Sequence, residues 1–83
     1  MELEGHPNHA KCVDFSPDGE LLVSGCRDGE LRIWKADSGD SRASIKAHRN
    51  SIYSVAVSPS GGHIASASFD RTIKIWEIDE LIG

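Results

Sequence analysis

The sequence has no long hydrophobic run, and it contains few cysteines and few aromatic residues. No apolar stretch approaches the roughly 18 to 20 residues that a membrane-crossing helix needs, so we expect no membrane partner. The two cysteines, Cys12 and Cys26, are too few for a disulfide framework, and no secretory hydrophobic segment stands at the N-terminus. These absences predict reduced thiols and a cytoplasmic location.

Basic side chains are also scarce. Nine Lys and Arg residues against 13 Asp and Glu residues give a net charge of −4, the opposite of the basic surface that phosphate contacts require. We therefore expect no nucleic-acid partner. With 39% hydrophobic residues in 83 positions, the chain has the composition of one small globular domain, and its own core can only be modest.

The chain repeats itself at an offset of 42 residues, which aligns His6 with His48 and Trp34 with Trp76. When residues 6–41 are aligned with residues 48–83, 11 of 36 positions are identical. A period of this size is typical of proteins in which each unit buries its apolar faces only against its neighbours. We therefore divide the chain into a first unit, residues 1–46, which begins with part of an outer strand, and a second unit, residues 47–83.

Each unit predicts short antiparallel strands joined by tight turns such as Ser16-Pro17-Asp18-Gly19. Helical periodicity is absent, and seven residues follow Trp76. We expect an all-β fold of two four-stranded units, the second lacking most of its outer strand. The predicted strands are residues 11–15, 21–26, 31–35 and 41–46 in the first unit and 52–57, 63–68 and 72–78 in the second.

The motifs of the first unit resemble the WD40 repeat. They are Gly5-His6, Ser16-Pro17-Asp18-Gly19, Leu22-Val23-Ser24-Gly25, Arg27-Asp28-Gly29 and Leu31-Arg32-Ile33-Trp34. The second unit resembles the repeat equally well, so the match covers nearly the whole chain. Departures are small: the Asp that usually follows the Trp is Lys35 or Glu77, and the Gly before the second His is Ala47. The resemblance implies four-stranded propeller blades.

Each unit carries a His, Ser, Asp and Trp set that could be taken for a hydrolase triad. A catalytic site needs one copy beside a substrate cleft, whereas this set recurs and ends on an indole, which can only donate. The resemblance implies instead a structural hydrogen-bonded chain from Asp to His to Ser to Trp. We predict a non-enzymatic protein, with a hydrolase as the less favoured alternative. The sets are His6, Ser24, Asp28 and Trp34, and His48, Ser66, Asp70 and Trp76.

Metal binding is a second possible chemistry, because His6, His9 and Cys12 stand three residues apart and could approach a zinc ion. The second unit has Ser51 and Ser54 at the corresponding places, and no fourth ligand follows. Gly-rich loops that cradle phosphates are absent as well. We expect no metal and no cofactor.

Partner binding is the function that the resemblance implies, because WD40 propellers use the rim of one face as a docking platform. Phe69 is the most telling candidate, since aromatic residues are disfavoured in tight turns and exposed ones dominate interface energetics. The alternative is that Phe69 and Tyr53 pack against a neighbouring blade. A basic first unit beside an aromatic second unit suits an acidic or aromatic-bearing protein or peptide. The candidate partner-binding residues are His9, Lys11, Arg27, Ser51, Tyr53 and Phe69.

Two blades cannot close a propeller, which normally has four to eight. From Trp76 of one copy to His6 of the next is 13 residues, against 14 from Trp34 to His48, so copies could continue head to tail. We predict a homo-oligomeric ring of three or four copies with six or eight blades; the alternative is a natural two-blade piece of a longer propeller. Apolar residues predicted on the two outward faces are Val13, Phe15, Leu22, Ile33, Val55, Val57, Ile64 and Ile75.

Overall fold

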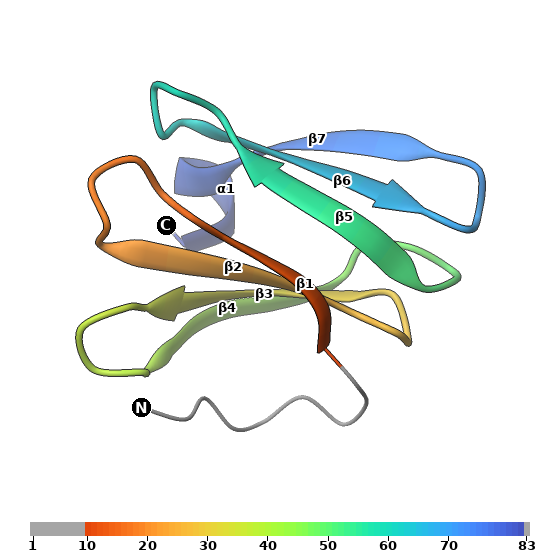
Figure 1. The fold of residues 1–83 in the computed structure, drawn as a ribbon, viewed down its shortest axis with the longest axis horizontal. Coiled ribbons are helices and arrows are strands. Elements are labelled where there is room, and N and C mark those ends of the chain that lie inside the picture. The colour runs from red at the N-terminus through yellow and green to blue at the C-terminus, as the bar shows by residue number, and fades with distance from the viewer. Residues whose placement is uncertain (1–9, 83) are drawn as a thin grey trace.

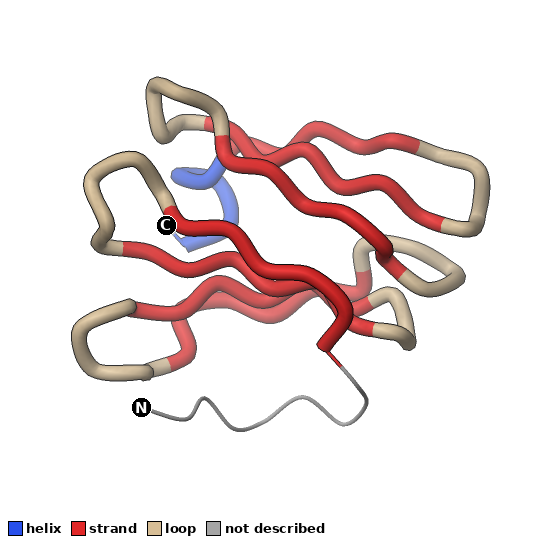
Figure 2. Tube along the Cα trace, in the orientation of Figure 1, coloured by secondary structure: helices blue, strands red, loops and turns tan. Residues whose placement is uncertain are grey.

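The computed structural model describes residues 10–82, which form two antiparallel sheets packed against each other (Figure 1). The strand orders are β1-β2-β3-β4 and β5-β6-β7, so each sheet is a simple meander (Figure 2). Strands β1 and β3 each begin one residue before the predicted start. The elements are β1 (Ala10–Phe15), β2 (Leu21–Cys26), β3 (Glu30–Lys35), β4 (Ser41–Lys46), β5 (Ile52–Val57), β6 (His63–Ser68), β7 (Ile73–Glu77) and the helix α1 (Ile78–Ile82).

The turns after β1 and β5 use the same hydrogen bonds in both sheets. The Gly19 N–H donates to the Ser16 carbonyl and the Gly61 N–H to the Ser58 carbonyl, both at 2.9 Å. Both glycines have positive φ, 74° and 78°, which costs glycine little because it has no Cβ. The serine hydroxyls then accept from the first N–H of the following strand. All of these hydrogen bonds lie within six consecutive residues, 16–21 or 58–63.

The end of the second unit differs from the sequence prediction. The strand expected over residues 72–78 is shorter, because Thr72 binds Asp70 within the preceding turn, and the chain forms an unpredicted helix after Glu77. The Ile78 N–H donates to the Gly62 carbonyl at 3.0 Å, and the Ile78 side chain is buried. The chain thus turns inward toward apolar side chains. Among residues 10–82, no helix is long and apolar enough to cross a membrane.

A β-bulge occurs near the start of the inner strand in both sheets. The pairing of β1 with β2 shifts register around Lys11, and the pairing of β5 with β6 shifts around Tyr53. A bulge leaves its extra residue out of the ladder and bends the strand. Both side chains are exposed, so the bulges present two of the candidate partner-binding residues to solvent.

The hydrophobic core lies between the two sheets. Burial of one such aliphatic side chain stabilises a fold by roughly 1.5–3 kcal/mol, so this interface is the main apolar contribution to the stability of the pair. The buried members are Val23, Leu31 and Ile33 from the first sheet, Ala47 from the connecting loop, Ile52, Val55 and Ile64 from the second sheet, and Ile78 from α1.

Gly29 lies where the connecting loop approaches the first sheet most closely. The Ala47 and His48 N–H groups both donate to the Gly29 carbonyl, at 3.0 and 3.1 Å. A Cβ at Gly29 would meet the His48 carbonyl oxygen at 2.1 Å, and the φ of Gly29 is +88°. Both observations require glycine here.

Two apolar faces point away from the core. Val13 and Phe15 of β1 are 59% and 57% exposed, and we call this the head face. Ile73 and Ile75 of β7 are 72% and 65% exposed, and we call this the tail face. Neither face is covered by the other sheet.

The predicted composition of these faces was partly wrong. Ile33, Val55 and Ile64 were expected to point outward, but they lie in the core between the sheets. Val57, which was also expected to point outward, packs against this core. Alternation along a strand shows which residues share a face, but it does not show which of the two faces meets the neighbouring sheet.

Candidate functional site

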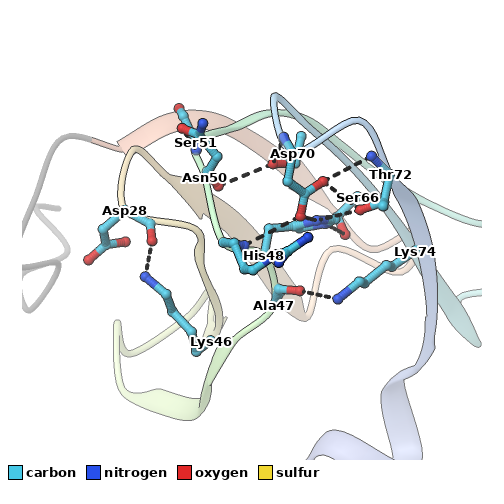
Figure 3. A network of polar contacts seen from close by, with 12 residues as sticks. Asp28, Lys46, Ala47, His48, Asn50, Ser51, Ser66, Asp70, Thr72 and Lys74 are labelled. Atoms are coloured by element: carbon cyan, nitrogen blue, oxygen red, sulfur yellow. Dashed lines mark hydrogen bonds and ion pairs between the residues drawn. The ribbon is translucent and has the colours of Figure 1, made fainter.

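His48 lies at the centre of a hydrogen-bonded network in the second sheet (Figure 3). Its Nδ1 atom contacts Asp70 Oδ2 at 2.9 Å, and its Nε2 atom contacts Ser66 Oγ at 2.7 Å. Trp76 Nε1 donates to the same serine oxygen at 3.1 Å. The structure brings all four members of the second predicted set together. Asp70 comes from the β6–β7 turn, His48 from the loop before β5, and Ser66 and Trp76 from β6 and β7.

The indole of Trp76 can only donate, so Ser66 Oγ accepts from it and has its own hydrogen to direct to His48 Nε2. In the tautomer that carries its proton on Nδ1, His48 donates to Asp70. This assignment gives both ring nitrogens a partner.

Thr72 extends the network at Asp70. Its hydroxyl donates to Asp70 Oδ1 at 2.5 Å, and its N–H donates to the same oxygen at 2.9 Å. The Thr72 hydroxyl is the largest influence on Asp70; with His48 and backbone N–H groups it outweighs burial and holds the pKa of this carboxyl well below its usual range. Sequence comparison of the units missed Thr72, because Glu30 stands at its place in the first unit.

The network connects structural elements and leaves no accessible nucleophile. Ser66 is fully buried, at 0% exposure, and its hydroxyl is engaged by Trp76 and His48. A catalytic serine must reach a substrate carbonyl, and Ser66 has no such access. Among the described residues, no group of three or more His, Cys, Asp or Glu side chains is placed to hold a metal ion.

The first sheet contains part of the equivalent set. Trp34 Nε1 donates to Ser24 Oγ at 2.9 Å, and both residues are buried. The fourth member, His6, and the potential zinc ligand His9 lie outside the described residues. The tryptophan-to-serine contact is thus the same in both sheets.

Asp28 occupies the β2–β3 turn, where its Oδ1 atom accepts from the Glu30 N–H at 3.0 Å. Burial raises the pKa of Asp28. Hydrogen bonds from the Glu30 N–H and the Cys26 thiol, together with the Lys46 charge, outweigh burial and place that pKa below its usual range. Asp28 is therefore held as a carboxylate within its turn.

Tyr53 and Phe69 form an exposed aromatic pair. Their ring centroids are 5.0 Å apart with an angle of 47° between the planes, a tilted arrangement that aromatic rings favour. The side chains are 53% and 65% exposed, so neither ring is covered by the first sheet. Lys11 and Arg27 are exposed on the first sheet.

Ser51, one of the candidate partner-binding residues, offers little surface to a partner. Ser51 is only 8% exposed, because the loop before β5 folds under the β6–β7 turn, where the Phe69 N–H donates to the Ser51 carbonyl at 3.0 Å. His9, the equivalent candidate in the first unit, lies outside the described residues.

Two further polar contacts, one from the second sheet to the connecting loop and one between the sheets, were not predicted. Lys74 Nζ donates to the Ala47 carbonyl at 2.8 Å and lies 5.9 Å from the Trp76 ring centroid. Asp14 Oδ2 accepts from the Val57 N–H at 2.8 Å. A basic residue stands at the same position in both units, Arg32 and Lys74, and this repetition could have pointed to the contact of Lys74. Nothing in the sequence pointed to the contact between Asp14 and Val57.

The two sheets are meanders that pack face to face, and their inner strands β1 and β5 are adjacent. This is the arrangement of two neighbouring β-propeller blades. The family model described as "WD domain, G-beta repeat" matches residues 1–35 and 39–77. The chain belongs to the WD40 family, whose members are generally non-enzymatic scaffolds for protein interactions.

Relatives are similar over one repeat or slightly more. The serine-threonine kinase receptor-associated protein of Gallus gallus is 51% identical over 41 residues, covering 46% of this chain and 12% of that protein. A probable cytosolic iron-sulfur protein assembly protein 1 of Kluyveromyces lactis is 54% identical over 35 residues, covering 42% and 10%. The matched segments therefore span only about a tenth of the length of these relatives.

The fold matches solved WD40 domains over nearly its whole length. The crystal structure of the RRP9 WD40 repeats superposes with a TM-score of 0.90 at 26% identity, covering 95% of this chain and 26% of that one. The structure of U3-55K matches with the same values. In both comparisons the chain corresponds to about a quarter of the neighbour.

The lowered pKa of Asp70 predicts a specific acid sensitivity. A carboxyl with a depressed folded-state pKa adds stability above its unfolded value, about 3.9, and this is lost as pH falls through the folded value. We expect the difference in unfolding free energy between the parent and Asp70→Asn to shrink below about pH 4 in urea titrations at fixed protein concentration. Asp37→Asn, in the exposed β3–β4 turn, is the control. A constant difference between parent and Asp70→Asn down to pH 3 would contradict this assignment.

Proposed function

We propose that this chain is a protein-interaction scaffold that assembles head to tail with copies of itself into a closed propeller. Three or four copies would give six or eight blades. One observation carries the proposal. The exposed head face is equivalent to the surface that the second sheet buries in the core, and the exposed tail face is equivalent to the surface that the first sheet buries there.

The head face is equivalent to the half of the core that belongs to the second sheet. In the alignment of the two units, Val13 and Phe15 correspond to Val55 and Val57. Val55 is buried, and Val57 packs against the same core. The head face thus carries apolar residues at the same positions as the surface of the second sheet that packs on the first.

The tail face is equivalent to the other half. Ile73 and Ile75 correspond to Leu31 and Ile33, which are 1% and 0% exposed beneath the second sheet. The head face and the tail face are therefore equivalent to the two surfaces that meet inside the chain. Repeated head-to-tail contacts form a ring when the rotation closes.

The turn between the second and third strands of each blade differs between the internal contact and a contact between copies. Arg71 stands where Gly29 stands in the first unit, and it has a φ of 73°. A Cβ at Gly29 would clash with the connecting loop, so the loop at a seam between copies must lie farther from this turn than His48 lies from Gly29.

The same faces would be covered by further blades if the 83 residues are a piece of a longer propeller. The short coverage of the relatives favours this alternative. Both readings require a WD40 blade on each face, and they differ in the mass of the 83-residue chain in solution.

We further propose that the Tyr53–Phe69 pair is the partner-binding anchor of the assembled scaffold, with Lys11 and Arg27 beside the neighbouring turns. Two exposed rings supply a large rigid contact area, and the basic residues suit a protein or peptide that carries acidic and aromatic side chains. A cytoplasmic location is consistent with the free thiols of Cys12 and Cys26.

Light scattering on a size-exclusion column tests the assembly. We expect three or four chain masses for the parent, and a monomer for either Val13→Glu/Phe15→Glu or Ile73→Glu/Ile75→Glu, because each pair places charges on one apolar face. An equimolar mixture of the two variants should form a dimer that grows no further, since one intact head face meets one intact tail face.

A folded, monodisperse parent monomer at micromolar concentration would contradict self-assembly and favour the longer-propeller alternative. A mixture of the two variants that remains monomeric while the parent assembles would show that the copies do not associate head to tail.

A further inference from the structure

The packing between the two sheets leaves no room for a methyl group beside β2. Strand β5 lies against β1 and β2 (Figure 1), and Ile52 at the start of β5 is fully buried. A Cβ at Gly25 would lie 2.6 Å from Ile52 Cγ2 and 2.8 Å from Cys12 Sγ, closer than van der Waals contact allows. The internal contact thus pairs a large side chain, Ile52, with a glycine.

The sizes at these two positions are exchanged at the exposed faces. In the alignment of the two units, Ile52 corresponds to Ala10, beside the head face. Gly25 corresponds to Ala67, which pairs with Ile73 and therefore lies beside it on the tail face. In a contact between copies that repeats the internal packing, Ala67 of one copy faces Ala10 of the next. The shorter side chain of Ala10 then leaves room for the methyl group of Ala67.

A second exchange of size occurs toward the end of the inner strands. Asp14 Oδ2 accepts from the Val57 N–H at 2.8 Å, so these two residues are neighbours across the internal contact. Asp14 corresponds to the exposed Ala56, and Val57 corresponds to Phe15 of the head face. Between copies, the larger side chain of Phe15 therefore meets a methyl group where a carboxylate stands in the internal contact.

The small side chain of Ala56 leaves no backbone donor without a partner at this place. In the internal contact, the Val57 N–H uses one oxygen of Asp14. Between copies, the equivalent donor is the Phe15 N–H, and Asp14 Oδ1 of the same chain accepts from it at 3.0 Å. One carboxylate thus serves both inner strands, and the second copy needs to supply no acceptor.

We propose that each exposed face selects a second copy of this chain through these two size exchanges. This inference rests on the proposed head-to-tail assembly and names residues that determine its specificity. A well-packed interface tolerates neither overlap nor a void. A blade with isoleucine at the place of Ala10 would overlap Ala67, and a blade with valine at the place of Phe15 would leave a void over Ala56.

The two units are therefore not interchangeable in the ring. The second unit has Ile52 and Val57 at these places, so its buried face fits the first unit and does not fit the tail face. The head face of another copy has both of the required sizes. Misfit with the wrong partner is a source of specificity, and here it makes first and second units alternate around the ring.

A single contact between copies can be measured with the two face-blocked variants. The head-blocked chain, Val13→Glu/Phe15→Glu, keeps its tail face, and the tail-blocked chain, Ile73→Glu/Ile75→Glu, keeps its head face. Their mixture forms one head-to-tail dimer, and sedimentation equilibrium gives its dissociation constant. Circular dichroism of each chain alone shows whether a further substitution alters folding.

The first exchange is tested by a double-mutant cycle. Ala10→Ile on the tail-blocked chain should raise the dissociation constant by about tenfold or more, because isoleucine overlaps Ala67. Ala67→Gly on the head-blocked chain should raise it by about threefold to tenfold, because a methyl contact is lost. Both changes together should bring it within about threefold of the original pair, since isoleucine then faces glycine as Ile52 faces Gly25.

Ala65→Gly on the head-blocked chain is the matched control. Ala65 lies on the same strand and the same side of the sheet as Ala67. This substitution removes a methyl group from the same surface but not from the position that faces Ala10. It should therefore fail to restore the binding that Ala10→Ile loses.

The second exchange is tested in the same way. Ala56→Leu on the head-blocked chain should weaken the dimer by about tenfold or more, because leucine overlaps Phe15. Phe15→Val on the tail-blocked chain makes room for the leucine and should restore most of this loss, as Val57 leaves room for Asp14 in the internal contact.

The outcomes separate this inference from the assembly on which it rests. If the blocked chains form the dimer but the paired substitutions show no recovery, the size exchanges are wrong and self-assembly stands. The same conclusion holds if Ala10→Ile or Ala56→Leu leaves the dissociation constant unchanged, or if Ala65→Gly restores binding as well as Ala67→Gly does. A parent that stays monomeric, or blocked chains that do not pair, would overturn both proposals.

Discussion

Replacement of Trp34 by alanine should lower the free energy of unfolding by about 3–5 kcal/mol, the range for deleting a buried aromatic side chain. Trp34 is 2% exposed, so the deletion leaves a cavity and removes the hydrogen bond to Ser24. For a chain of this size, such a loss is comparable to the whole stability of a small domain. Thermal melts followed by circular dichroism measure the effect.

Trp34→Phe separates packing from hydrogen bonding. Phenylalanine retains much of the apolar volume but cannot donate to Ser24 Oγ, so its cost should be clearly smaller than that of alanine. A Trp34→Ala variant that melts within a degree or two of the parent would contradict the placement of Trp34 in a buried blade.

Ser66→Ala should cause the second largest loss. The Ser66 hydroxyl joins His48 Nε2 to Trp76 Nε1, so its removal leaves two polar atoms without this partner. Each buried group that loses its partner costs about 1–3 kcal/mol. Chemical denaturation should therefore show a lower midpoint with an unchanged slope.

The serine at the start of β4 provides the control for this change. Ser41 is exposed, and Ser41→Ala should change the free energy of unfolding by less than about 0.5 kcal/mol. The same experiment separates a scaffold from a hydrolase: Ser66→Ala should lose stability and keep partner binding, whereas a catalytic serine would lose turnover and keep its fold. Equal effects of Ser66→Ala and Ser41→Ala would show that the network does not contribute to the stability of the fold.

Some parts of the site were accessible from the sequence because they recur. His48, Ser66, Asp70 and Trp76 could be named together from the repeat and the family resemblance, and the structure places them in contact. Thr72 has no counterpart in the first unit, so comparison of the units gave no signal for it. Its role depends on the distance from its hydroxyl to Asp70, which only the folded turn defines.

Exposure was harder to predict than strand position. Tyr53 and Phe69 are exposed as an interacting pair, while Ser51, a polar residue beside a strand, is buried. The difference arises because the connecting loop packs under the β6–β7 turn, and this packing is a contact between segments about 20 residues apart.

The sequence by itself determined the strands and their turns, because alternation, proline and glycine act over a few neighbouring residues. The tertiary structure alone decided which face of each sheet is buried, where the chain goes after β7, and which edge stays open. Val55 and Ile75 are both apolar strand residues of the second unit, yet one is buried and the other exposed. Their difference depends on the side from which the first sheet packs, and no local interaction within the second unit specifies that side.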